Sequence, residues 1–331
     1  MRFAPLGSTG LSVSVACMGT APFGKQTDET VSHQILSLAA EAGVNFIDTA
    51  DMYPMNADLA LVGRTEEITG RWLKGKRDRF ILATKAGGQM GPSPWDQGSS
   101  RKHLLIAIDA SLRRLGTDYV DLYQLHIDDA QTPLDETIEA LDSIVRSGKA
   151  RYIGVSNFLA YRLARAIGRA NTLRLGRFVS VQPRYNLLFR EIERELLPLA
   201  REENLAVIPF NPLAGGLLTG KYRHDETPAG GRFSAQNGQF GKLYQARYWH
   251  EREFQTIEQL LSIAAEKGQS LISLSVAWVL ANPAITSVIL GASRPEQLAD
   301  NLAGVDLRIE PELKQRLDDL TIEYRRGDAV R

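Results

Sequence analysis

Side chains that can exchange protons stand at or just after the ends of three short apolar runs. Asp48 and Tyr53 lie in "NFIDTADMYP". Lys85 ends "RFILATK", and His126 ends "YVDLYQLH". A tyrosine phenol has an ordinary pKa of about 10, and a neighbouring ammonium group lowers that pKa because it favours the phenolate. Lys85 could supply the ammonium group, and Asp48 could hold Lys85 charged and in place, so the set predicts a proton-transfer site.

Each of these residues also has an ordinary structural explanation when it is taken alone. Asp48 could cap the following helix, and Tyr53 could be a loop aromatic. Lys85 could be a solvated strand end, and His126 a histidine with satisfied hydrogen bonds. The proton-transfer prediction therefore depends on an architecture that brings the side chains to one place.

Such an architecture follows from the alternation of short apolar runs with helical patterns, which is typical of βα units and a parallel sheet. The candidate strands are residues 13–19, 45–50, 79–85, 119–126, 150–157, 178–182, 206–210 and 285–291. A doubly wound open sheet would also alternate in this way. Eight units without a linker or a composition break favour one (β/α)₈ barrel, a single domain over residues 1–331. The carboxyl ends of barrel strands meet on one face, so the polar strand ends should converge there.

Two helices are predicted in detail. Before Gly43, one helix should bury a stripe made of Val31, Ile35, Leu38 and Ala42. After Thr132-Pro133, a second should bury Leu134, Ile138, Leu141 and Val145 before Gly148.

Two segments do not fit the simple repeat. "PLGSTGLSVS", residues 5–14, predicts a β-hairpin that could plug the bottom of the barrel. Residues 222–250 are polar and Gly-rich with interleaved aromatics. This long segment could be a lid that helps to wall the substrate pocket together with Phe23 and Trp95. It could equally be a surface loop whose aromatics pack against the helix predicted after Trp249.

Composition narrows the classes of partner. Among the 331 residues, 39 Lys and Arg balance 39 Asp and Glu, so no broad field favours nucleic acid or an anionic membrane. No stretch approaches the roughly 20 apolar residues of a membrane-spanning helix. We therefore expect a cytoplasmic protein with a small-molecule substrate; its oligomeric state stays open. The single cysteine, Cys17, excludes an internal disulfide and is expected to be a buried structural thiol.

A set of motifs carries a family resemblance along the whole chain. In order, they are "GVNFIDTADMYP", "LATK", "YVDLYQLH", "ARYIGVSN", "VQPRYNLL", "FNPLAGGLLTGKY" and "GASRPEQLADNL". Together they resemble the aldo-keto reductase superfamily, and especially bacterial reductases related to potassium-channel β-subunits. The resemblance implies a (β/α)₈ barrel that uses NADP(H), without a metal, to reduce an aldehyde or ketone to an alcohol or to oxidise the alcohol.

The resemblance also implies individual roles. Tyr53 matches the general acid, Lys85 and Asp48 match the pair that lowers its pKa, and His126 matches the residue that orients the substrate carbonyl. Asp51 has no matching role and is expected to be a solvated loop carboxylate or a local cap. The residues implied for the nicotinamide are Ser156, Asn157, Gln182 and, by stacking, Phe210. Those implied for the pyrophosphate are Asn211, Leu213 and Gly215, and those for the adenosine end are Ser293, Arg294, Gln297 and Asn301. An arginine beside a serine suits the 2′-phosphate of NADP(H).

Rival classes of function lack their motifs. "GGLLTGK", residues 215–221, fits the start of a phosphate loop, but Tyr222 stands where a nucleotide triphosphatase needs Ser or Thr for Mg²⁺. No G-x-G-x-x-G follows a candidate strand. Of the five histidines, only His126 lies at a predicted strand end, so a metal site is not expected. The remaining alternative is a nucleotide-sensing regulatory or binding subunit of the same fold with little turnover.

Overall fold

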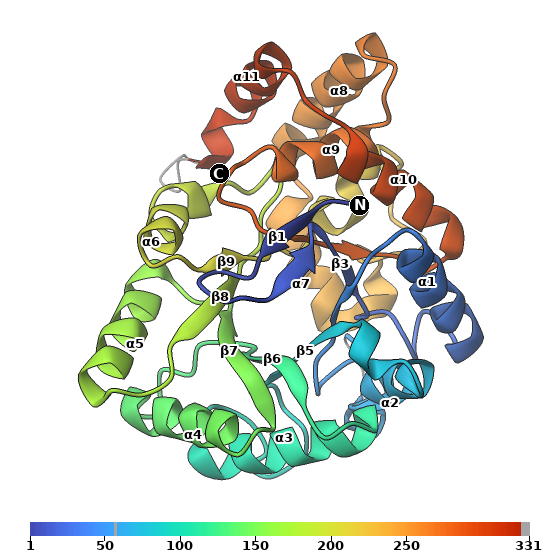
Figure 1. Cartoon of the computed structure of the whole chain (residues 1–331). Helices are drawn as coiled ribbons and strands as arrows, with labels where there is room; N and C mark the ends of the chain where they lie inside the picture. The colour runs from blue at the N-terminus through green and yellow to red at the C-terminus, as the bar shows by residue number, and fades with distance from the viewer. Residues whose placement is uncertain (56–57, 326–331) are drawn as a thin grey trace.

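The strands of the barrel form one parallel sheet in the computed structural model, which describes residues 1–55 and 58–325 (Figure 1). The predicted domain end at residue 331 therefore lies outside the described residues. Neighbours in the sheet follow the order β10-β3-β4-β5-β6-β7-β8-β9. The strands are β3 (Ala16–Gly19), β4 (Phe46–Asp48), β5 (Ile81–Ala86), β6 (Val120–Leu125), β7 (Ala150–Ser156), β8 (Phe178–Gln182), β9 (Ala206–Val207) and β10 (Val288–Gly291).

Short contacts between β9 and β10 close the sheet into a barrel. Val207 forms a parallel bridge with Ile285, and the Ile289 amide donates a hydrogen bond to the Pro209 carbonyl at 2.9 Å. Each predicted strand range overlaps one strand of this sheet, and β5 extends one residue past its predicted range, to Ala86. The predicted (β/α)₈ fold is confirmed.

The predicted N-terminal hairpin is also present. It consists of β1 (Phe3–Pro5) and β2 (Ser12–Ser14), which pair antiparallel. Leu6 and Val13 of this region are fully buried and belong to the same apolar cluster as the barrel residues Phe46 and Leu122. The hairpin thus fills the amino-terminal end of the barrel. Cys17 lies in the same cluster with no exposed surface, as expected of a structural thiol.

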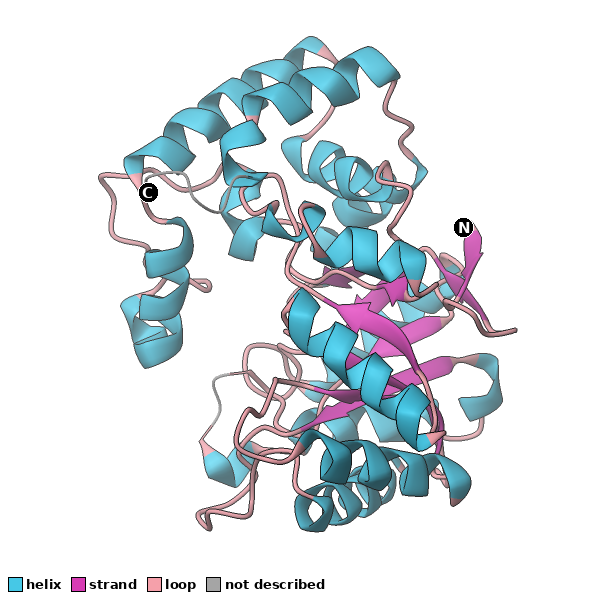
Figure 2. Ribbon diagram, turned by 90° about the vertical axis from the view of Figure 1, so that its left-hand side faces the viewer, coloured by secondary structure: helices cyan, strands magenta, loops and turns pink. Residues whose placement is uncertain are grey.

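Helices surround the strands, as Figure 2 shows. They are α1 (Glu29–Glu41), α2 (Arg64–Leu73), α3 (Arg101–Leu115), α4 (Leu134–Arg146), α5 (Ala160–Leu173), α6 (Leu196–Glu202), α7 (Gly238–Tyr248), α8 (Glu251–Glu266), α9 (Leu271–Leu280), α10 (Pro295–Asp306) and α11 (Pro311–Leu320). Short 3₁₀ turns occupy Leu59–Leu61, Arg77–Arg79, Glu191–Glu193, Ala214–Thr219, Ala235–Asn237 and Ile322–Arg325.

The buried face of α1 differs from the predicted stripe. Leu38 is 41% exposed, whereas the buried positions are Ser32, Ile35, Leu36 and Ala39. The helix begins at the Asp28 cap, whose carboxylate accepts the Val31 amide at 2.9 Å, and this start sets its rotation against the barrel. In α4, by contrast, the predicted Ile138 and Leu141 are fully buried.

The segment 222–250 contains a helix of its own, α7, rather than being a loop throughout. Its aromatic side chains pack locally. Phe233 is fully buried and lies 5.1 Å from Trp249 between ring centroids, and Trp249 lies 4.9 Å from Phe254 of α8. Local packing against the following helix is therefore present. Whether the segment also closes over a ligand stays a prediction.

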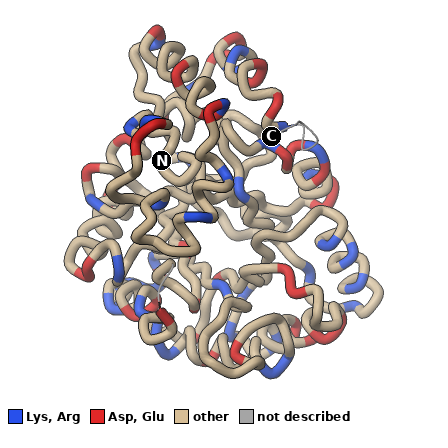
Figure 3. The backbone as a smooth tube through the Cα atoms, turned by 180° about the vertical axis from the view of Figure 1, so that it is seen from behind, with Lys and Arg blue, Asp and Glu red and all other residues tan. Residues whose placement is uncertain are grey.

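Charges are mixed over the molecule, and the view in Figure 3 shows acidic and basic residues interspersed along the chain. Within residues 1–55 and 58–325, no helix has the length and apolar character that a membrane crossing requires. The cytoplasmic location stays a prediction.

Candidate active site

Asp48, Tyr53, Lys85 and His126 meet at the carboxyl ends of β4, β5 and β6. The Lys85 ammonium donates hydrogen bonds to Asp48 Oδ2 at 2.5 Å and to the Thr49 carbonyl at 2.6 Å. Its nitrogen lies 5.0 Å from the centre of the Tyr53 ring. The Tyr53 and His126 rings meet edge to face with centroids 5.6 Å apart. The proton-transfer residues predicted from the sequence are thus brought together.

Backbone pairing explains this convergence. In the parallel ladders, Asp48 pairs with Ala83 and Lys85 pairs with Gln124, so consecutive strand ends lie side by side. The Asp51 amide donates to the Lys85 carbonyl at 3.0 Å, which ties the loop after β4 to the end of β5. The Tyr53 carbonyl accepts the Gly63 amide at 3.0 Å, so the loop is also fixed on its far side.

Burial changes the expected electrostatics of Tyr53, which is only 8% exposed. Burial raises its pKa, and the Lys85 charge and hydrogen bond oppose that effect without cancelling it. The pKa of Tyr53 is therefore raised above that of an ordinary tyrosine, whereas the sequence analysis expected a lowered value. Burial alone would lower the pKa of Lys85, but Asp48 and Tyr53 raise it above its usual value. The lysine is charged and the tyrosine carries its proton near neutrality.

His126 is neutral in this environment. Burial, and then the Lys85 charge, lowers its pKa to about 3. A neutral imidazole has one N–H donor and one acceptor. Its Nδ1 is buried without a hydrogen-bond partner in the described parts of the chain. The ring can therefore position a carbonyl oxygen without adding a charge.

Gln124 is a site residue that the sequence analysis missed. Its amide donates to Asp48 Oδ1 at 3.1 Å, and the Gln182 amide donates to the same oxygen at 2.9 Å. Gln124 follows Leu122 by two residues, so both side chains lie on the same face of the strand. Because Leu122 faces the barrel interior, strand periodicity could have placed Gln124 there. Gln182, implied as a nicotinamide ligand, has its amide nitrogen engaged with Asp48.

The other residues implied for the nicotinamide lie beside this centre. Ser156 at the end of β7 donates to the Gln182 carbonyl at 2.9 Å. Asn157 donates to the His126 carbonyl at 2.9 Å and adopts a positive φ of 58°. Phe210 is half-buried and packs against the apolar cluster inside the barrel. These positions form the rim of the barrel around the proton-transfer group.

The residues implied for the pyrophosphate form one turn. Asn211 Oδ1 accepts the Gly215 amide at 2.5 Å, and Asn211 Nδ2 donates to the Tyr248 hydroxyl at 3.1 Å. Leu213 lies between them, half-buried. Gly215 has φ of 74°, and a Cβ there would lie 2.5 Å from the Tyr244 ring, so only glycine fits this turn. The turn is therefore attached to α7.

The residues implied for the adenosine end gather at the start of α10. Gln297 Oε1 accepts the Ser293 amide at 2.9 Å, and Asn301 Nδ2 donates to the Gly291 carbonyl at 3.2 Å. Asn301 Oδ1 is buried without a partner in the described residues. Arg294 is exposed. The pKa of Lys221 is lowered, first by the partial burial of Lys221 itself and second by the charge of Arg294. The charges of Lys221 and Arg294 therefore interact, and the unpartnered Asn301 oxygen is free to accept a hydrogen bond from a ligand.

Lys221 ends the "GGLLTGK" motif, and the sequence analysis gave it no role, either as part of a phosphate loop or among the residues implied for the cofactor. Asp51 was misjudged. It has no exposed surface, and burial, followed by the nearby Glu66, raises its pKa well above the usual range. The prediction of a solvated carboxylate is wrong, because Asp51 is fully buried near Glu66 of α2. Both of its carboxylate oxygens lack a hydrogen-bond partner in the described residues, which also excludes a local cap.

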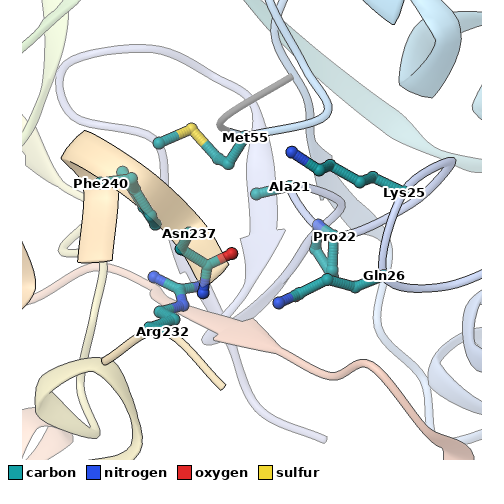
Figure 4. Close-up of a pocket in the computed structure, with 8 residues that line it drawn as sticks. All are labelled: Ala21, Pro22, Lys25, Gln26, Met55, Arg232, Asn237 and Phe240. Carbon is teal, nitrogen blue, oxygen red and sulfur yellow. The ribbon is translucent and has the colours of Figure 1, made fainter. Parts of the chain in front are cut away.

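A cavity adjoins the Tyr53 loop, as Figure 4 shows. Its lining residues are Ala21, Pro22, Lys25, Gln26, Met55, Arg232, Asn237 and Phe240. The Met55 amide donates to the Ala21 carbonyl at 3.0 Å, so the loop after β3 and the Tyr53 loop form adjacent walls. Phe23 is fully buried and does not line this cavity, and Trp95 is 53% exposed elsewhere on the rim. In the described residues, no cluster of three or more His, Cys, Asp or Glu could hold a metal ion.

Comparisons with known proteins agree with this geometry. The model of the Aldo/keto reductase family matches residues 16–322. "Uncharacterized oxidoreductase YrpG" from Bacillus subtilis (strain 168) is 37% identical over 328 residues, which cover 97% of this chain and 96% of that protein. "Probable voltage-gated potassium channel subunit beta" from Arabidopsis thaliana is 37% identical over 312 residues, which cover 93% of this chain and 92% of that protein. "L-glyceraldehyde 3-phosphate reductase" from Escherichia coli (strain K12) is 33% identical over 312 residues, which cover 92% of this chain and 88% of that protein.

The matched region contains all eight barrel strands and every residue implied for catalysis or for the cofactor. The relatives include both a bacterial oxidoreductase and channel β-subunits, as the resemblance suggested. This chain therefore belongs to the aldo/keto reductase family.

Proposed function

We propose that this protein is an NADPH-dependent oxidoreductase that reduces an aldehyde or ketone to an alcohol, reversibly, as a single barrel domain. One observation carries the proposal: the buried Lys85 and Asp48 ion pair stands beside a buried tyrosine that keeps its proton. Bound NADPH would supply the hydride to the carbonyl carbon. Tyr53 gives its proton to the carbonyl oxygen, so the product is a neutral alcohol.

Lys85 makes this proton transfer possible. When Tyr53 loses its proton, the phenolate lies next to an ammonium group that attracts it. Asp48 holds that ammonium group in place, and the Gln124 and Gln182 amides hold Asp48. Neutral His126 faces the Tyr53 ring and can donate one N–H bond to the same carbonyl oxygen.

The preference for NADPH is supported by the two cations Lys221 and Arg294. Their charges are close enough for Arg294 to lower the pKa of Lys221. A 2′-phosphate carries the charge that two neighbouring cations would attract. Ser156, Asn157, Gln182 and Phe210 would hold the nicotinamide end beside Tyr53. Asn211, Leu213 and Gly215 would follow the pyrophosphate.

A second function has support from the relatives. Two of them are named as probable potassium-channel β-subunits, so a nucleotide-binding regulatory subunit is the alternative. Such a protein would bind NADPH without steady turnover. The complete set of proton-transfer residues favours the enzyme, because binding alone does not need a buried acid with a matched cation.

The test is steady-state oxidation of NADPH by the purified protein with a panel of aldehydes and ketones. The panel includes a phosphorylated aldehyde, because one relative is named for the reduction of L-glyceraldehyde 3-phosphate. Substrate-dependent turnover is expected. Quenching of NADPH fluorescence on binding, with no turnover on any carbonyl, would favour the regulatory alternative.

A further inference from the structure

Glu66 is a carboxylate with no exposed surface at the start of α2. Its Oε1 accepts a hydrogen bond from the Thr84 hydroxyl of β5 at 2.5 Å. Its Oε2 accepts a second one from Arg114 Nε, near the end of α3, at 2.7 Å, and the two side chains form an ion pair. Glu66 therefore joins α2, β5 and α3 at one point.

This point lies between the two residues of the proposed proton transfer. Thr84 directly precedes Lys85, and successive side chains of a strand point to opposite faces, so Thr84 faces α2 while Lys85 faces the barrel interior. The start of α2 also holds the Tyr53 loop, because the Tyr53 carbonyl accepts the amides of Gly63 at 3.0 Å and Thr65 at 3.5 Å. The distance between Tyr53 and Lys85 therefore depends on how the start of α2 is fixed against β5.

Arg114 supports the same loop from the side of α3. Gly63 has a φ of 88°, and a Cβ at this position would lie 2.6 Å from Arg114 Cδ and 2.8 Å from Arg114 Nε. The Arg114 side chain thus packs directly against the backbone of the residue whose amide holds Tyr53. Arg114 is itself fixed by Glu66 and by the Ser111 hydroxyl, which accepts a hydrogen bond from Nη2 at 3.3 Å.

Asp51 shows that the Tyr53 loop packs onto this ion pair. Asp51 is fully buried, and its amide donates to the Lys85 carbonyl at 3.0 Å. Burial, followed by the Glu66 charge, raises the pKa of Asp51 well above its usual range, which favours the neutral carboxyl. Arg114 then compensates one carboxylate, that of Glu66, and a buried ion pair requires such a balance of charge.

We propose that Glu66 and Arg114 are positioning residues that set the distance between the Tyr53 phenol and the Lys85 ammonium group. The inference rests on the proposed reductase function. Lys85 attracts the phenolate that forms during proton transfer, and this attraction weakens with distance. A displacement of about 1 Å can lower an enzymatic rate about 10²-fold. Disrupting the ion pair should therefore slow proton transfer, whereas the residues implied for the cofactor lie on other strands and loops.

The experiment measures kcat, KM and the Kd for NADPH in the parent and in variants of the pair. Glu66→Gln keeps the shape of the side chain and removes its charge, so kcat should fall about 10- to 100-fold while the Kd for NADPH stays near the parent value. Arg114→Gln should behave in the same way. Arg114→Lys keeps the charge and should recover part of the lost kcat. Thr84→Val removes only the hydroxyl bond to Glu66 and should lower kcat less, which provides a milder variant if Glu66→Gln does not fold.

A double variant separates positioning from a general effect on the fold. When Glu66→Gln is combined with Tyr53→Phe, no proton donor remains to be positioned. The residual rate of Tyr53→Phe should therefore not fall further, because the two substitutions act on one unit. A second fall of the same size as in the parent background would assign Glu66 to stability alone and overturn the inference.

Asp121→Asn is the matched control. Asp121 forms a largely buried ion pair with Arg77 at 2.7 Å and accepts the Leu82 amide at 2.8 Å, but it lies toward the amino-terminal ends of β5 and β6, away from Tyr53. Its substitution should lower Tm, as that of Glu66 does, without the fall in kcat.

Three outcomes would count against the inference. Parent values of kcat in Glu66→Gln and Arg114→Gln, with activity lost in Tyr53→Phe, would overturn the inference and leave the reductase function intact. An equal fall of kcat in Asp121→Asn would also overturn it. No turnover of any carbonyl by the parent would overturn the proposed function and the inference with it.

Discussion

Replacing Tyr53 with phenylalanine removes the proposed proton donor and keeps the aromatic ring. The ring's edge-to-face contact with His126, at 5.6 Å, and its contact with the Lys85 ammonium, at 5.0 Å, do not require the hydroxyl. Lys85 keeps its hydrogen bonds to Asp48 and to the Thr49 carbonyl. The substitution therefore removes the phenol proton and the hydrogen bond between the hydroxyl and Lys85, and it leaves these other contacts in place.

The expected loss is that of general acid catalysis. Positioned proton donors contribute about 10²- to 10⁴-fold to a rate, which corresponds to about 3 to 5 kcal/mol of transition-state stabilisation. The residues implied for the cofactor do not include Tyr53, so NADPH binding should stay near the parent level. Carbonyl reduction should thus fall by about 10²-fold or more while the Kd for NADPH is nearly unchanged.

The assay is NADPH oxidation with an aldehyde that the parent reduces, together with fluorescence titration of NADPH. Tyr123→Phe provides a matched control, because Tyr123 is fully buried on β6 and its hydroxyl contacts the Leu104 carbonyl instead. The control should keep most of the activity. A Tyr53→Phe enzyme that turns over at the parent rate would refute the assignment of the acid. A joint loss of activity and NADPH binding would point to a disturbed fold rather than a missing proton.

Further predictions concern pH, the cofactor and the segment 222–250. The value of kcat/KM for reduction should be nearly constant between about pH 6 and 9, because the pKa of His126 is lowered to about 3 and that of Tyr53 is raised above its ordinary value. A pH profile with an inflection near the ordinary pKa of histidine would contradict this assignment. Arg294→Ala should weaken the binding of NADPH about 10- to 100-fold and the binding of NADH much less. The dissociation constants of NADPH and NADH, measured for the parent and the variant, test this prediction. An unchanged ratio of the two constants would exclude a contact between Arg294 and the 2′-phosphate. Backbone hydrogen exchange in 222–250 should slow when NADPH binds, because Tyr248 of α7 is bonded to Asn211 of the implied pyrophosphate turn. Exchange that is the same with and without cofactor would leave this segment as ordinary surface structure.

Much of the fold could be predicted because its signals are local. Apolar runs that alternate with helical patterns indicate βα units, and each predicted strand range overlaps a strand of the barrel. The meeting of Asp48, Lys85 and His126 also follows from local information, since each stands at a strand end and parallel strand ends share one face. The position of Gln124 is also predictable from local sequence, because it lies two residues after the inward-facing Leu122 on the same strand.

The burial and the electrostatic neighbours of a side chain depend on contacts between segments that are distant in the chain. Local sequence patterns do not specify these contacts. Asp51 looked like a solvated loop residue, yet the loop folds inward and burial raises its pKa. Lys85 was expected to lower the pKa of Tyr53, but the desolvation of the phenol outweighs that charge. Arg232 stands 179 positions after Tyr53 in the chain, by the difference of their numbers, and only the tertiary fold brings its side chain to a cavity that Met55 of the Tyr53 loop also lines. The sequence by itself determined the barrel and the types of proton-transfer residue, because periodicity and strand ends are properties of neighbouring residues. The tertiary structure decided which charges are buried and which face each other, because desolvation and Coulomb energy depend on distances through space.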